Sequence, residues 1–236
     1  MQSELKFVQA WDIETTGQRL QGADKMFAVG SATLEVDMST GAVRQVASGR
    51  WVLEINPNAS KPWAHVWAEG GYDQRCWTEF WSKHADILDK LMKDTPAGRR
   101  FNDDAAMAAS IAEHIAWTEK AFGDGIVRVY DTIGFDVTEI GNLLERHGHP
   151  SIFLVRKGWP CATSYLDDVR RAALDIDPLG TTTAAQRELR RQHDAAALPA
   201  GLSHTHDPAD DAASIAWKWV HYRGIVAAKL ASPVRN

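Results

Sequence analysis

The chain has 236 residues, 44% hydrophobic and 24% charged, so it can bury a core without disulfides or a structural metal. Its net charge of −5 argues against a protein that grips long duplex nucleic acid through counterion release. An enzyme that holds only the last nucleotides of a strand is still allowed. Cys76 and Cys161 form no CxxC pattern, which excludes a disulfide framework and predicts one buried cysteine and one chance surface thiol in a reducing compartment.

Apolar runs bounded by polar turns predict three strands at the start of the chain. They cover residues 6–13, 26–36 and 43–55, and their short connections imply an antiparallel meander. Residues 56–75 are rich in Asn, Pro, Gly and Trp, so we expect a loop there.

The rest of the chain alternates between helical and extended patterns. The expected elements are a helix over 78–92, a helix over 104–122, a strand over 125–131, a helix over 136–147, a short strand over 160–166 and a helix over 181–193. Residues 194–206 are expected to form a loop. The last helix should begin at Asp207–Pro208, where Asp caps and Pro suits the first helical position, and should run to 219 or 222.

This order of elements predicts an α/β fold with a mixed central sheet of about five strands, the first three antiparallel, flanked by helices. We expect a single domain over 1–236 with its core over about 6–222. The N-terminus lacks the pattern of a signal peptide, and no run approaches the roughly 20 apolar residues of a membrane helix. A cytoplasmic protein without a membrane partner is therefore expected.

Asp12 and Glu14 lie at the end of the first strand. Residues i and i+2 of a strand point to the same face, so both carboxylates project together. They repel each other unless a cation lies between them, and oxygen ligands select hard ions such as Mg²⁺ or Mn²⁺. Taken alone, the pair is more simply interpreted as a polar strand end, because DxE occurs often by chance.

Three further titratable residues lie at or next to the start of an expected helix. Asp136 opens the 136–147 helix, where a helix cap is the simpler interpretation. Asp211 falls in the first turn of the last helix, and His206 lies just before it. A histidine beside a metal site is suited to take a proton from water, whereas the alternative is a capping cluster with a solvated histidine.

Three motifs together resemble a known family. WDIETTG at 11–17, GFDVTEIGNLLERHG at 134–148 and HDPADDA at 206–212 are similar, in order and rough spacing, to the motifs of DEDDh-type 3′–5′ exonucleases. These are the RNase T and DnaQ-like exonucleases of the ribonuclease-H-like superfamily. One departure is Thr132, where family members often carry Asn.

The resemblance implies a function and a set of roles. Asp12, Glu14 and Asp211 would coordinate one divalent ion, Asp12 would be shared with a second, and Asp136 would bind directly or through water. Two such ions, Mg²⁺ or Mn²⁺, roughly 3.5–4 Å apart, assist phosphodiester hydrolysis. His206 would deprotonate the attacking water, and nucleoside 5′-monophosphates would leave from the 3′ end of single-stranded DNA or RNA.

Substrate contacts are expected mainly within the motifs. The candidates are Ile13, Thr15, Thr16, Gly17 and Phe135, together with Trp63 and Trp67 as a base-stacking platform. Core packing is the alternative for the tryptophans, which crowd one region at Trp63, Trp67, Trp77 and Trp81. Five arginines could steer phosphates or simply form a solvated face: Arg170, Arg171, Arg187, Arg190 and Arg191.

Two other functions stay open. A relative of the same fold that binds nucleic acid without cleaving it would not need all five motif residues. An unrelated zinc hydrolase would use His204 and His206, but the chain lacks the repeated βα units of the barrels that carry such pairs. Many members of the family form homodimers, and we treat the oligomeric state as open.

Overall fold

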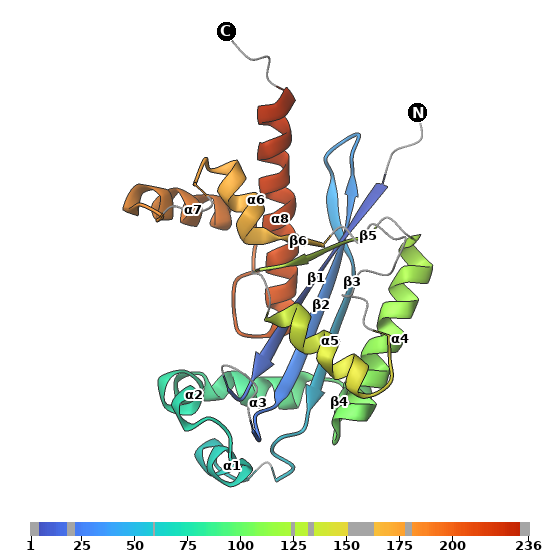
Figure 1. The fold of residues 1–236 in the computed structure, drawn as a ribbon, viewed down its shortest axis with the longest axis vertical. Coiled ribbons are helices and arrows are strands. Elements are labelled where there is room, and N and C mark those ends of the chain that lie inside the picture. Colours follow the sequence, from blue (N-terminus) through green and yellow to red (C-terminus); the bar gives the residue numbers. More distant parts are fainter. Residues whose placement is uncertain are drawn as a thin grey trace.

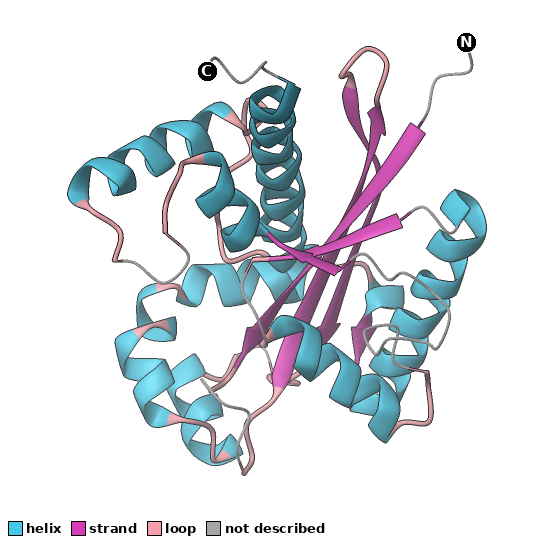
Figure 2. Ribbon diagram, turned by 45° about the horizontal axis from the view of Figure 1, so that its top comes forward, coloured by secondary structure: helices cyan, strands magenta, loops and turns pink. Residues whose placement is uncertain are grey.

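A computed structural model describes residues 5–17, 22–58, 60–123, 126–131, 135–150, 163–177 and 181–231. A six-stranded sheet in the order β4-β3-β2-β1-β5-β6 runs through the molecule, with helices on both faces (Figures 1 and 2). The strands are β1 Leu5–Thr15, β2 Met26–Asp37, β3 Val43–Leu53, β4 Arg100–Phe101, β5 Ile126–Tyr130 and β6 Thr163–Tyr165.

The first three strands form the expected antiparallel meander, since β2 pairs antiparallel with both β1 and β3. Strand β5 pairs parallel to β1, and β6 parallel to β5, which makes the sheet mixed as expected. The sheet has one strand more than the expected five or so because two residues of β4 pair parallel to the end of β3.

The helices and helical turns are α1 Trp63–Gly70, α2 Gln74–Glu79, η1 Trp81–Lys83, α3 Ala85–Asp94, η2 Ala97–Arg99, α4 Asp104–Phe122, α5 Asp136–Arg146, α6 Leu166–Ala173, α7 Ala184–Ala196 and α8 Pro208–Ala231. None of the helices in the described ranges is both long and apolar enough to cross a membrane.

The alternation of β1 divides the core into two parts. Val8 and Ala10 belong to a cluster that packs against α6 and α8. Trp11 and Ile13 belong to the other cluster, which contains side chains from α1 through α5. Because successive strand residues point to opposite faces, Asp12 and Glu14 share the face of Val8 and Ala10, which is the face that α8 covers.

The expected loop over 56–75 is wrong, because α1 forms within it. Trp63, Val66 and Trp67 are buried at helical spacing, and Gly71 ends the helix in the left-handed conformation with φ of 65°. The helix expected over 78–92 is broken into α2, η1 and α3. These short segments wrap around the end of β1 (Figure 1).

Later elements also differ from expectation. Helix α6 was not foreseen, and it begins directly after β6, where the strand expected over 160–166 ends. Helix α8 begins at Pro208 as expected but continues to Ala231, well beyond 222. Cys76 is buried with a free thiol, as expected, whereas Cys161 and Thr132 lie outside the described residues.

Candidate active site

Three carboxylates meet where the end of β1 passes the start of α8. Oxygen atoms of Asp12, Glu14 and Asp211 all lie within 4.8 Å of one another. The face alternation of β1 turns the first two toward α8, and the first turn of α8 supplies the third. Two segments about 200 positions apart in the chain thus build one site from local features that the sequence already displayed.

A glycine lets α8 come this close to the sheet. Gly30 of β2 pairs with Asp12, and a Cβ at Gly30 would overlap the backbone of Pro208. No side chain larger than hydrogen fits there without moving the start of α8. Gly30 therefore determines how near Asp211 comes to Asp12.

A buried ion pair holds the same helix end from β3. Arg50 pairs with Gly30 in the sheet, and its Nε lies 3.0 Å from Oδ1 of Asp207. A second contact joins Arg50 Nη2 to Oδ2 of the same carboxylate. Asp207 also accepts the Ala209 N–H at 3.1 Å, which is the expected helix cap.

The loop before α8 folds around the Asp211 carboxylate. Asp211 accepts hydrogen bonds from the backbone N–H of Thr205 at 2.8 Å and of His206 at 3.0 Å. His204 Nδ1 lies 3.1 Å from Oδ2 of the same carboxylate. His206 adopts a φ of 58°, which is uncommon for a residue with a side chain. These contacts hold His204 and His206 on the site.

The close approach of these carboxylates favours a bound cation. Burial raises the pKa of Asp12 well above its usual range, and the charges of neighbouring carboxylates raise it further. Burial, followed by the charge of Asp211, has the same effect on the pKa of Glu14. A set of carboxylate oxygens held together against their repulsion fits a hard divalent ion such as Mg²⁺ or Mn²⁺.

Asp136 stands beside this group. It is the first residue of α5 and only 8% exposed. Burial and the charge of Asp131 raise its pKa to about 7. The charge of Asp136 in turn raises the pKa of Asp12, so the two are neighbours, although Asp136 is outside the group of three within 4.8 Å. The structure thus brings all four predicted acidic residues to one place.

His206 joins the site from the loop before α8. Its Nδ1 lies 3.9 Å from Oε1 of Glu14. Burial lowers its pKa, and the nearby His204 lowers it further. The imidazole is therefore neutral at neutral pH and available to accept a proton.

Two tryptophans donate hydrogen bonds to the segment that follows Glu14. Trp81 Nε1 donates to the carbonyl of Thr15 at 2.9 Å, and Trp67 Nε1 donates to that of Thr16 at 3.3 Å. The Thr15 hydroxyl donates to the carbonyl of Gly17 at 2.8 Å. The three predicted substrate contacts in this turn are therefore held in one conformation next to Glu14.

The other predicted substrate residues belong to the hydrophobic core or pack against it. Trp67 is fully buried and Trp63 is 8% exposed, so the structure favours core packing over a base-stacking platform for both. Ile13 is 7% exposed within the same core, and Phe135 packs against it just before α5. Of the arginines, Arg170 is only 3% exposed and pairs with Asp131, Asp167 and Asp194, which favours a structural role.

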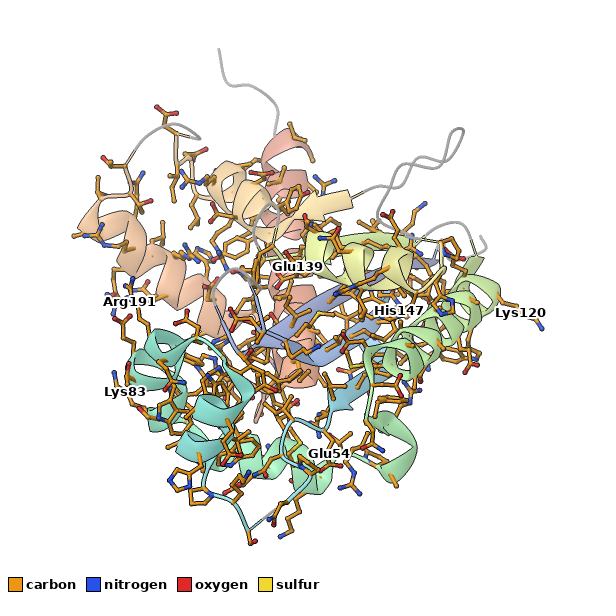
Figure 3. The ribbon with its side chains drawn as sticks, turned by 60° about the horizontal axis from the view of Figure 1, so that its bottom comes forward. Glu54, Lys83, Lys120, Glu139, His147 and Arg191 are labelled. Atoms are coloured by element: carbon orange, nitrogen blue, oxygen red, sulfur yellow. The ribbon has the colours of Figure 1, made fainter. Side chains whose placement is uncertain are left out.

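Two rings beside His206 were missed by the sequence analysis. The Phe80 and His84 ring centroids lie 4.7 and 4.9 Å from that of His206. Phe80 and His84 flank η1 on either side. In Figure 3 the label of Lys83 marks η1, and that of Glu139 marks α5. Nothing in the local pattern around residue 80 signals a contact with residue 206, because the contact depends on how α2, η1 and α3 wrap around the sheet.

Comparisons with known proteins bear on the fold. No protein-family model matches this chain, and no curated protein sequence matches it. It is similar to the solved structure of cell-death related nuclease 4 (CRN-4), with a TM-score of 0.51 and 13% identity over 93% of this chain and 64% of that one. The zinc-bound form of an E. coli ExoI–ssDNA complex matches with a TM-score of 0.47 and 16% identity, over 96% of this chain and 41% of that one.

This chain therefore spans less than two thirds of the length of either structure. At 13% identity, the likeness to CRN-4 concerns the fold, and it confirms the expected ribonuclease-H-like α/β architecture. A shared fold does not determine the function, which depends on the residues of the site.

Proposed function

We propose that this protein is a metal-dependent 3′–5′ exonuclease that shortens single-stranded nucleic acid. The observation that carries the proposal is the group of three carboxylates within 4.8 Å, with Asp136 and His206 beside it. A purely structural role does not explain it, because burying like charges together costs stability. The nuclease fold of CRN-4 supports the proposal.

The donor set fits two divalent ions, Mg²⁺ or Mn²⁺. Asp12, Glu14 and Asp211 would hold one ion, Asp12 would be shared with the second, and Asp136 would bind directly or through water. When bound, such ions supply the positive charge that stabilises a phosphodiester as it is attacked and cleaved. The backbone N–H groups that bind Asp211 orient its carboxylate toward the cluster.

His206 would act as the general base. Its neutral form takes the proton of the attacking water, and its place 3.9 Å from Glu14 stabilises the imidazolium that results. The rings of Phe80 and His84 restrict the orientation of the imidazole. They also offer the terminal base a surface for ring contact, in place of the buried Trp63 and Trp67.

The test uses 5′-labelled single-stranded DNA and RNA oligonucleotides with Mg²⁺, Mn²⁺ or EDTA. We expect a ladder that shortens from the 3′ end with either metal and not with EDTA. Asp12→Ala should abolish the ladder. Asp86→Ala should not, because Asp86 is an exposed carboxylate in the first turn of α3. Oligonucleotides that stay intact under every metal condition but bind the protein would instead favour a non-catalytic binding module.

A further inference from the structure

A second group of potential metal ligands overlaps the carboxylate cluster. Ligand atoms of His204, His206 and Asp211 all lie within 4.8 Å of one another. His204 Nδ1 is 3.1 Å from Asp211 Oδ2, and the two imidazole centroids are 4.5 Å apart. Of the two groups of three ligands found among the described residues, this is the one that contains nitrogen atoms.

The two groups suit different ions. The oxygen-only group fits hard ions such as Mg²⁺. Two imidazole nitrogens and one carboxylate oxygen match the three-ligand sites that hold Zn²⁺, and such donors bind Zn²⁺ more tightly than earlier divalent ions. The two groups share Asp211, so full occupancy of one competes with the other.

The surroundings of the nitrogen-containing group suit a binding site. The side chain of His204 is 61% exposed, which gives an ion a path from solvent, whereas that of Asp211 is 2% exposed. The backbone N–H groups of Thr205 and His206 hold the Asp211 carboxylate in place. Outer hydrogen bonds of this kind orient metal ligands and strengthen binding.

We propose that His204, His206 and Asp211 form an inhibitory Zn²⁺ site. The zinc ion would occupy the general base and remove one carboxylate from the hard-ion group at the same time. The inhibitory consequence rests on the exonuclease function proposed above, whereas zinc binding itself does not. His204 is the ligand that belongs to this site alone.

The test measures binding and inhibition separately, with the full chain. Isothermal titration with ZnCl₂ gives the affinity of the wild type, His204→Ala and His221→Ala. His221 is the matched control because its Nε2 lies 3.1 Å from Nδ1 of His193, in another histidine pair. The Mg²⁺-supported nuclease rate is then measured against free Zn²⁺, relative to each variant's own rate without zinc. The Tm of each metal-free variant verifies folding.

We expect His204→Ala to weaken zinc binding at least about tenfold, since changes outside the ligand shell alone already cost 10–100-fold. The midpoint of inhibition should move by the same factor, and His221→Ala should change neither value. The proposal is overturned if zinc does not bind, if His204→Ala binds it like the wild type, or if His221→Ala loses as much. Full activity at saturating zinc would also overturn it. Zinc binding that depends on His204, in a protein inactive with every metal, would support the site and reject the exonuclease.

Discussion

The ion pair between Arg50 and Asp207 should be the most sensitive contact outside the carboxylates. The Asp207 side chain is 1% exposed and that of Arg50 is 20% exposed. Arg50→Met removes the charge but keeps most of the side-chain length. Among the residues that the structure describes, Asp207 is then left in the interior with Lys90 as its one ionic partner, 4.0 Å away and itself half exposed.

The magnitude follows from burial. Breaking a buried pair by removing one partner costs about 3–5 kcal/mol, because the remaining charge is uncompensated. Domains of roughly this size lose about 2–4 °C of Tm per kcal/mol, so Arg50→Met should lower Tm by about 6–20 °C. The chain contains a matched control on the same strand. Arg44 contacts Glu35 through the same two nitrogens, but its side chain is 72% exposed.

Arg44→Met should therefore cost less than about 1 kcal/mol, as exposed ion pairs do. Thermal unfolding of the metal-free variants, followed by circular dichroism, gives both shifts, and the urea midpoint provides an independent measure. The double variant Arg50→Met/Asp207→Asn should recover part of the loss, since no buried charge is left behind. Equal shifts for the two single variants, or no shift for Arg50→Met, would refute the reasoning.

Three further predictions concern single residues. Gly30→Ala should cost about 1–3 kcal/mol and sharply reduce nuclease activity, because the added methyl overlaps the Pro208 backbone. Gly98 has open space around it, so the stability of Gly98→Ala should stay within about 0.5 kcal/mol of the wild type. Equal Tm values for Gly30→Ala and Gly98→Ala would contradict this prediction. Asp12→Asn should raise the Tm of the metal-free protein by relieving repulsion, while abolishing both cleavage and any Mg²⁺-induced rise in Tm. Burial lowers the pKa of His114 to about 4 in the folded protein. Its contribution to the free energy of unfolding is therefore fully present above about pH 6.5, where the histidine of the unfolded chain is neutral, and is lost as the pH drops toward 4. At 1.36 kcal/mol per pKa unit, the loss of stability reaches about 3 kcal/mol. If Tm falls as steeply with decreasing pH in His114→Gln as in the wild type, His114 is not the cause.

The sequence by itself determined the parts of this protein that depend on neighbours in the chain. Alternating and apolar runs predicted β1 to β3, because strand residues repeat their environment every second position. Asp207 and Pro208 marked the start of α8, since a cap and a first-turn proline act locally. The same local rules turned Asp12 and Glu14 to one face and put Asp211 in a helical first turn.

Only the tertiary structure decided what covers each residue. Burial of a ring depends on which distant elements pack on it, so Trp67 lies in the core while Phe80, between α2 and η1, contacts the ring of His206. The close approach at Gly30 likewise joins strand and helix backbones that no local pattern relates. Periodicity and caps report on a few residues at a time, whereas packing is a property of the whole assembled chain.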